Sequence, residues 1–160
     1  MIPADPGTYI LTLRCDGTGT IRVGRLGSIS LRPGYYLYIG SAFGPGGLRA
    51  RIGHHGQRSL RPHWHIDYLR RHTTLESVAY GCGARCEHEW AARIGAAPGA
   101  AMVLRGFGSS DCSCETHLFR FDEAPSLAGF GEGLGASLAA YANSSFTTVP
   151  WTSVRRKSRP

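Results

Sequence analysis

Residues 34–42 have the sequence GYYLYIGSA, and this stretch decides how the first half of the chain folds. A Pro-Gly turn opens it, and the aromatic and β-branched residues that follow predict a strand over Tyr35–Ile39. Alternation along a strand places Tyr36 and Tyr38 on one face of the sheet. Strand tyrosines usually pack into a core with their hydroxyls at its rim, so this pair suits either core packing or a polar site.

Two further strands are expected on the N-terminal side of this stretch. Thr8–Arg14 (TYILTLR) alternates and is rich in β-branched and aromatic residues. A turn at Asp16–Gly19 separates it from a second strand near Ile21–Val23. The three strands together predict an antiparallel meander.

On the C-terminal side, residues 40–47 (GSAFGPGG) contain too much glycine and proline for regular structure. Helices are expected over Leu48–His55, Trp64–Arg71 and Glu87–Ile94, and short strands over Val78–Gly81, Met102–Leu104 and His117–Phe121. Residues 125–141 are rich in Gly, Ala and Ser and have a weak helical pattern. The sequence therefore predicts one domain over residues 1–123, and a Gly/Ala-rich extension with a basic tail over 124–160.

Composition and length suit a protein with one buried core. The chain has 160 residues, is 42% hydrophobic and carries a formal charge of +7. It contains no apolar run of the roughly 18 residues that a membrane span needs. Its N-terminus, MIPADPGTY, lacks the basic and apolar regions of a signal peptide. We therefore expect a cytoplasmic protein with no membrane partner.

The charge is unevenly distributed along the chain. Residues 1–75 contain ten Arg against three Asp, whereas residues 76–123 contain seven acids against four Arg. A basic half beside an acidic segment is what a phosphate-binding surface next to a cation site would produce. Two oppositely charged faces that pair with each other would produce the same pattern.

Arg51 and His55 are four residues apart, so a helix places them on one face. Arg neutralises the charge that builds on phosphate oxygens, and His moves protons near neutral pH. The pair thus suits phosphate chemistry, although a solvated basic helix face would also contain it.

Glu87 and Glu89 are two residues apart, so a helix directs them about 200° apart and only one can face a given site. A single inward carboxylate is enough to hold Mg²⁺, which keeps most of its waters. Acidic residues are also favoured in the first turn of any helix by its dipole.

Cysteine and histidine raise a second metal hypothesis. Cys82-x3-Cys86 and Cys112-x-Cys114 could supply four thiolates to zinc, with His88 or His117 as substitutes. These spacings differ from the usual C-x2-C of zinc knuckles, so zinc is the less favoured ion. His63, His65 and Asp67 form another cluster, for which structural hydrogen bonding is the simpler interpretation.

Taken together, these segments resemble the GIY-YIG nuclease superfamily. Gly7-Thr8-Tyr9 stands in place of the first signature, and Tyr38-Ile39-Gly40 matches the second. The later pattern Leu-x2-Arg-x3-His is matched by Leu48, Arg51 and His55, and Glu89 is the first candidate for the superfamily's helix glutamate, with Glu87 second. The 28 residues between Tyr9 and Tyr38 imply a hairpin insertion. The superfamily often has a late active-site Asn, which has no obvious equivalent in this chain, and the Ser109-Ser110-Asp111 loop is the candidate substitute.

The chain is more similar to an uncharacterised branch of that superfamily, described mostly as a domain of unknown function. The resemblance covers about residues 7–121. Its motifs are GYYLYIGSA, GPGGL-x2-R, RPHWHIDYL, a Cys/Glu-rich helix and GFGSSDC-x-C-x2-HLF, which occur at Gly34–Ala42, Gly44–Arg51, Arg61–Leu69, Cys86–Ala91 and Gly106–Phe119.

This resemblance implies an α/β (α+β) fold with a small, mainly antiparallel central sheet flanked by helices. It implies hydrolysis of phosphodiester bonds in nucleic acid, with DNA expected before RNA. Glu89 would hold one Mg²⁺ or Mn²⁺, Arg51 would stabilise the transition state, and Tyr9 would act as general base or orient water, with Tyr38 and His55 arranging the hydrogen bonds. The candidate substrate-binding residues are Gly40, Ser41, Arg49, Arg61 and His65. A non-catalytic nucleic-acid-binding module and a zinc-stabilised interaction domain are the alternatives.

Overall fold

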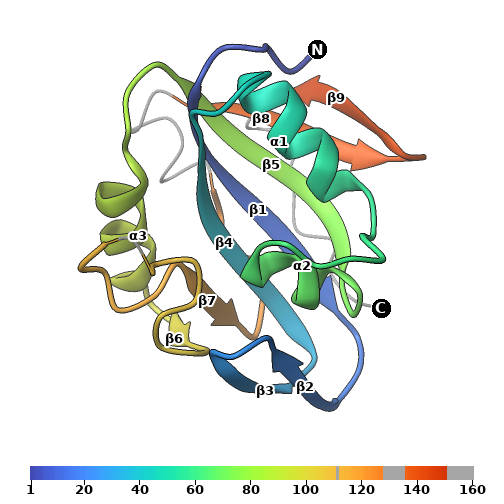
Figure 1. Cartoon of the computed structure of the whole chain (residues 1–160), viewed down its shortest axis with the longest axis vertical. Helices are drawn as coiled ribbons and strands as arrows, with labels where there is room; N and C mark the ends of the chain where they lie inside the picture. Colours follow the sequence, from blue (N-terminus) through green and yellow to red (C-terminus); the bar gives the residue numbers. More distant parts are fainter. Residues whose placement is uncertain (111, 128–135, 151–160) are drawn as a thin grey trace.

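The computed structural model describes residues 1–110, 112–127 and 136–150. Nine strands and three helices occur in these ranges (Figure 1). In chain order they are β1 (Gly7–Cys15), β2 (Gly19–Val23), β3 (Gly27–Leu31), β4 (Gly34–Ala42), α1 (Gly47–Gly56), α2 (His65–Arg70), β5 (Thr74–Cys82), α3 (Glu87–Gly95), β6 (Ala101–Met102), β7 (Leu118–Phe121), β8 (Ser137–Ala142) and β9 (Ser145–Val149).

Seven of the strands form one antiparallel sheet in the order β6-β7-β4-β1-β5-β8-β9. β1 lies in the middle because both of its edges are paired along almost their whole length, with β4 and with β5. The expected α+β fold with a mainly antiparallel sheet is therefore confirmed. Opposite β1, the register places Gly40 of β4 directly across from Tyr9.

The expected meander is wrong in one respect, because β2 and β3 pair with each other in a separate two-stranded sheet. β1 and β4 are each nine residues long and almost wholly buried, so pairing them buries far more apolar surface than β2 could. β2 and β3 alternate between buried and exposed residues and therefore bury only one face. They form the hairpin inserted between β1 and β4.

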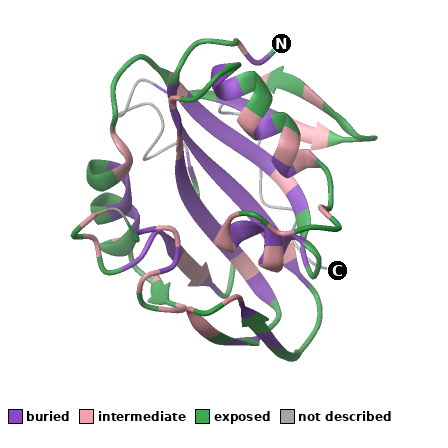
Figure 2. Cartoon of the chain, in the orientation of Figure 1, coloured by how far each residue is buried: buried purple, intermediate pink, exposed green. Residues whose placement is uncertain are grey.

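The central sheet separates two apolar cores. Tyr9, Leu11 and Tyr38 face the side that α1 and α2 cover, where Leu48 and Ile66 pack against them. The alternate strand residues face α3 and pack against Trp90, Ala91 and Ile94. Figure 2 shows the result, with the central strands buried along most of their length and the outer surfaces of the helices exposed.

The helical pattern expected over 125–141 is wrong where the structure describes it. Residues 137–142 form β8, which pairs with β5 and continues the central sheet through β9. A segment rich in Gly and Ser gains little from a helix, whereas the edge of β5 offers backbone groups that need partners. Residues 137–149 thus share the sheet of the domain expected to end at 123. Residues 128–135 and the basic tail lie outside the described residues.

No helix in the described ranges has the length and apolar character needed to span a membrane.

Candidate active site

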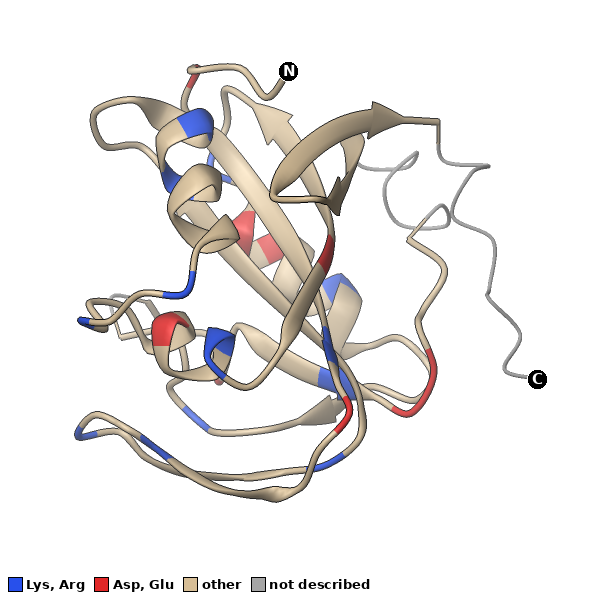
Figure 3. Cartoon of the chain, turned by 90° about the vertical axis from the view of Figure 1, so that its right-hand side faces the viewer, with Lys and Arg blue, Asp and Glu red and all other residues tan. Residues whose placement is uncertain are grey.

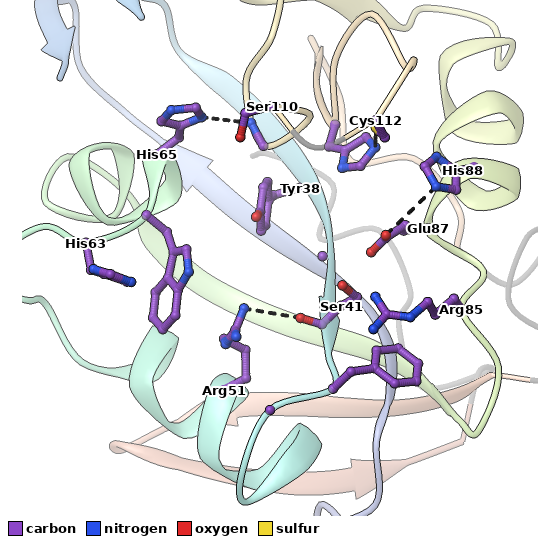
Figure 4. A pocket seen from close by; sticks show the side chains of 16 residues that line it. Tyr38, Ser41, Arg51, His63, His65, Arg85, Glu87, His88, Ser110 and Cys112 are labelled. Carbon is purple, nitrogen blue, oxygen red and sulfur yellow. Dashed lines mark hydrogen bonds and ion pairs between the residues drawn. The ribbon is translucent and has the colours of Figure 1, made fainter. Parts of the chain in front are cut away.

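A cavity of about 680 Å³ opens beside the end of β4 (Figure 4). β7 pairs only with residues 35–38 of β4, so the last residues of β4 have no strand on that side. Residues from α1, from 63–65, from the first turn of α3 and from the 108–117 loop surround this gap. Segments that are distant in the sequence therefore meet at one polar cavity.

β4 supplies three of the expected residues to the cavity, namely Tyr38, Gly40 and Ser41. A Cβ added at Gly40 would lie 2.5 Å from both Cζ and the hydroxyl oxygen of Tyr9. The ring of Tyr9 therefore occupies the space that any side chain at this position would need. This contact is a physical reason for glycine directly across the sheet from Tyr9.

Tyr9 does not line the cavity but lies fully buried behind it. Its hydroxyl is 2.6 Å from Nε2 of His55, which is also buried. Burial, reinforced by the neighbouring Tyr38, raises the pKa of Tyr9 well above its usual value although Arg51 lowers it. Burial likewise lowers the pKa of His55 from 6.5 to about 3. Both groups are therefore neutral near pH 7, and Tyr9 is a poor general base where it stands.

Arg51 lies in the cavity, as expected from its place on the face of α1 that also carries His55. Its guanidinium stacks 4.1 Å above the Trp64 ring, and Nη1 donates to the Ser41 carbonyl oxygen at 3.2 Å. No ion pair among the described residues includes it. Its positive charge is therefore held in place without an acidic partner from the described chain.

Arg85 brings a second positive charge to the cavity and was not predicted from the sequence. Its guanidinium lies 4.1 Å above the ring of Phe43, and both residues line the cavity. It belongs to the loop between β5 and α3, where nothing in the sequence pattern distinguishes it from a surface arginine. Figure 4 shows Arg85 and Arg51 approaching the cavity from different elements.

The two glutamates of α3 point in different directions, as helix geometry requires. The one that faces the cavity is Glu87, whereas Glu89 was the first candidate from the sequence. Glu87 lines the cavity, and it is the only carboxylate there among the described residues. Glu89 is exposed and pairs with Arg93 at 3.3 Å on the outer surface of α3. The expectation that Glu89 faces the site is therefore corrected to Glu87. The sequence carried the signal, because Glu87 is three and seven residues before the buried Trp90 and Ile94.

The family comparison adds one result to this geometry. A family described as "Domain of unknown function DUF123" matches residues 8–135. The chain belongs to this family. No curated protein and no solved structure matches it. Every residue that lines the cavity lies inside the part of the chain that matches DUF123.

Three of the candidate substrate-binding residues of this DUF123 chain remain to be placed, and one of them lines the cavity while two do not. His65 lines it, and its Nδ1 accepts a hydrogen bond from the Gly108 backbone NH. Arg49 is exposed on α1 and donates to the Ile2 carbonyl oxygen, so it holds the N-terminus. Arg61 is exposed outside the cavity. Figure 3 shows that basic residues nonetheless recur along α1, the loop after it and the β2–β3 hairpin.

Asp67 has the structural role that its cluster suggested. One carboxylate oxygen accepts hydrogen bonds from the backbone NH groups of His63 and Trp64, and the other lies 3.0 Å from His54 Nε2. Burial opposes ionisation, but these hydrogen bonds and His54 outweigh it and lower the pKa of Asp67. The carboxylate thus holds the start of α2, which carries Trp64 and His65 into the cavity wall.

The proposed cysteine quartet does not form. Cys82 and Cys86 lie apart from the other two thiols, whereas His88, Cys112, Cys114 and His117 place one ligand atom each within 4.8 Å of one another. The only other group of this kind in the described residues contains His54, His55 and Asp67, which the hydrogen bonds above already engage.

Proposed function

We propose that this chain is an endonuclease that hydrolyses phosphodiester bonds in nucleic acid, with DNA expected as the substrate before RNA. The observation that carries the proposal is the composition of one cavity. It contains two guanidinium groups without acidic partners among the described residues, one carboxylate and one tyrosine hydroxyl, backed by a buried Tyr–His pair. This combination is consistent with the resemblance of the Tyr38-Ile39-Gly40 and Arg51/His55 motifs to GIY-YIG nucleases.

Glu87 would hold the divalent cation. Mg²⁺ and Mn²⁺ prefer oxygen ligands, and Mg²⁺ sites commonly use one or two carboxylates together with waters and substrate phosphate. A single carboxylate in a large polar cavity fits this pattern. When bound, the cation would polarise the phosphate and stabilise the leaving oxygen.

Arg51 and Arg85 would bind the phosphate and neutralise the charge that develops on its non-bridging oxygens. Each guanidinium is already stacked on an aromatic ring, so little side-chain freedom is lost when the substrate binds. Such preorganised charges contribute more to catalysis than flexible ones, because they need no reorganisation during the reaction.

Tyr38, rather than Tyr9, would orient the attacking water. Tyr38 is mostly buried but lines the cavity, whereas Tyr9 is enclosed and its hydroxyl is bonded to His55. The rings of Tyr9 and His55 each lie 6.3 Å from the ring of Tyr38, centroid to centroid. The buried pair would therefore position Tyr38 from behind.

The test is cleavage of labelled single-stranded, duplex, flapped and branched DNA and RNA with Mg²⁺, with Mn²⁺ and with EDTA. We expect metal-dependent cutting that falls at least about a hundredfold in Glu87→Gln, because several kcal/mol of charge stabilisation are lost. Glu89→Gln, two residues away on the exposed face of α3, is the matched control and should cut normally. Tyr38→Phe should slow turnover more than Tyr9→Phe while leaving nucleic-acid affinity nearly unchanged.

Two results would contradict this assignment. Activity that survives Glu87→Gln but not Glu89→Gln would show that Glu89, and not Glu87, is the metal ligand. Well-folded protein that binds nucleic acid yet cuts no substrate would make the chain a non-catalytic binding module.

A further inference from the structure

A cluster of four side chains of metal-ligating types lies at the far wall of the cavity, between α3 and the loop before β7. Nδ1 of His88 lies 3.1 Å from Sγ of Cys114, and Nε2 of His117 lies 3.5 Å from Sγ of Cys112. All four ligand atoms lie within 4.8 Å of one another. His88 comes from α3, whereas the other three come from residues 112–117.

The distances match a tetrahedral zinc site. With Zn–S of about 2.3 Å and Zn–N of about 2.0 Å, a tetrahedron separates a sulfur from a nitrogen ligand by about 3.5 Å. The distance between Cys112 and His117 equals this value, whereas the distance between His88 and Cys114 is about 0.4 Å shorter, so these two ligands would separate slightly to admit an ion. Two thiolates and two imidazoles form a closed donor set that is typical of structural zinc. They are poor ligands for the Mg²⁺ proposed at Glu87, which prefers oxygen.

The surroundings of the four ligands include a nearby carboxylate and an anchored backbone segment. The second ring nitrogen of His88, Nε2, lies 4.0 Å from a carboxylate oxygen of Glu87, which is within ion-pair distance but too far for a hydrogen bond. The His117 backbone is also anchored, because its NH donates to Phe107 and its carbonyl accepts from Ile39 of β4.

We propose that His88, Cys112, Cys114 and His117 bind one zinc ion that fastens residues 112–117 to α3. Residues 112–117 precede β7 and belong to no strand, so the hydrogen bonds of the sheet do not hold them against α3. The zinc ion would therefore hold the wall of the cavity that contains Gly108, Ser110 and Cys112. The chain would then carry two different metals, a structural zinc and a dissociable cation bound through oxygen. His88 would bind the zinc, and its sequence neighbour Glu87 would bind the other cation.

The experiment is metal analysis of the full chain, expressed in zinc-supplemented medium and purified without a histidine tag. We expect one zinc per chain in the wild type and less than about a tenth of that in Cys112→Ser/Cys114→Ser. Cys82→Ser is the matched control, since Cys82 is exposed and outside the cluster, and it should keep one zinc. Another metal at full occupancy, or zinc retained by the double variant, would overturn the assignment.

A variant with a partly exposed ligand guards against simple misfolding. The His88 side chain is 54% exposed, so His88→Asn should fold while binding zinc at least about a hundredfold more weakly in chelator competition, because even outer-shell changes cost 10- to 100-fold. Removing the metal from the wild type should also make two additional thiols react rapidly with a thiol reagent. Unchanged zinc affinity in His88→Asn, or an unchanged thiol count, would refute the site.

These readouts are independent of cleavage. Glu87→Gln should retain one zinc even though the proposed nuclease activity is lost. A wild-type protein that carries zinc but cuts nothing would refute the nuclease and leave the zinc site standing, and an active protein without zinc would do the reverse.

Discussion

Gly40→Ala tests whether the packing of one ring, that of Tyr9, explains why glycine follows Tyr38 and Ile39 in β4. The new Cβ would lie 2.5 Å from Cζ and the hydroxyl oxygen of Tyr9 and 3.0 Å from Cε1 of Tyr38. Carbon atoms in contact prefer about 3.5–4.0 Å, so the ring of Tyr9 must retreat by about 1 Å. Its hydroxyl is already 2.6 Å from Nε2 of His55. The shift therefore either breaks this hydrogen bond or displaces His55, which is itself buried.

The cost follows from those two effects. Overpacking a filled core costs about 1–3 kcal/mol, and a buried hydrogen bond left unmade costs about 1–3 kcal/mol more. We therefore expect the free energy of unfolding, measured by urea denaturation, to fall by about 2–6 kcal/mol. Gly53→Ala is the control, because a Cβ there meets nothing within 4 Å and alanine favours α1. A Gly40→Ala protein within about 0.5 kcal/mol of the wild type would refute the reasoning.

Two further predictions concern the buried polar groups around the cavity. Folding lowers the pKa of His55 from 6.5 to about 3, so between these pH values the imidazole is protonated in the unfolded chain but not in the folded one. The free energy of unfolding should therefore decrease as the pH falls through this window, by up to about 1.4 kcal/mol per pH unit. Urea titrations at several pH values measure the slope, which should be shallower in His55→Phe; an equal slope in both proteins would assign it to other groups. Asp67→Asn removes the charge that accepts two backbone NH groups and faces His54, so it should lower stability at pH 7 by about 1–3 kcal/mol. A wild-type unfolding midpoint for this variant would mean that the start of α2 does not depend on the carboxylate.

Local patterns predicted most of the elements, because each depends on residues near in sequence. The alternation in Thr8–Arg14 and the helical spacing of Arg51 and His55 both correspond to observed elements, with boundaries within a residue or two. β3, over Gly27–Leu31, was missed because its serines and glycine have weak strand preference, and only pairing with β2 stabilises it. β8 was missed for a similar reason, since the open edge of β5 decides its conformation.

The site was predictable in its parts but not in its arrangement. Tyr38 and Arg51 line the cavity as expected, because strand alternation and helix periodicity fix their directions. Ser41 lines it as well, although alternation along β4 places it on the face opposite to Tyr38. The burial of Tyr9 could not be inferred, since a strand pattern does not reveal which end of a face a helix will cover. The approach of His88 to Cys112 depends on the path of a loop that has no periodicity.

The β8–β9 hairpin has a consequence for how much of this chain can stand alone. The DUF123 match ends at residue 135, yet the sheet continues through β8 and β9 to 149. β8 covers the edge of β5, and Tyr141 donates a hydrogen bond to the Gly56 carbonyl oxygen at the end of α1. A chain cut at 135 would expose an edge strand whose residues 77–80 are buried here, and such edges recruit strands from other molecules. β9 takes the edge position instead, and its exposed side chains Ser145, Thr147 and Thr148 are polar, so the hairpin replaces a buried, mainly apolar edge with a polar one.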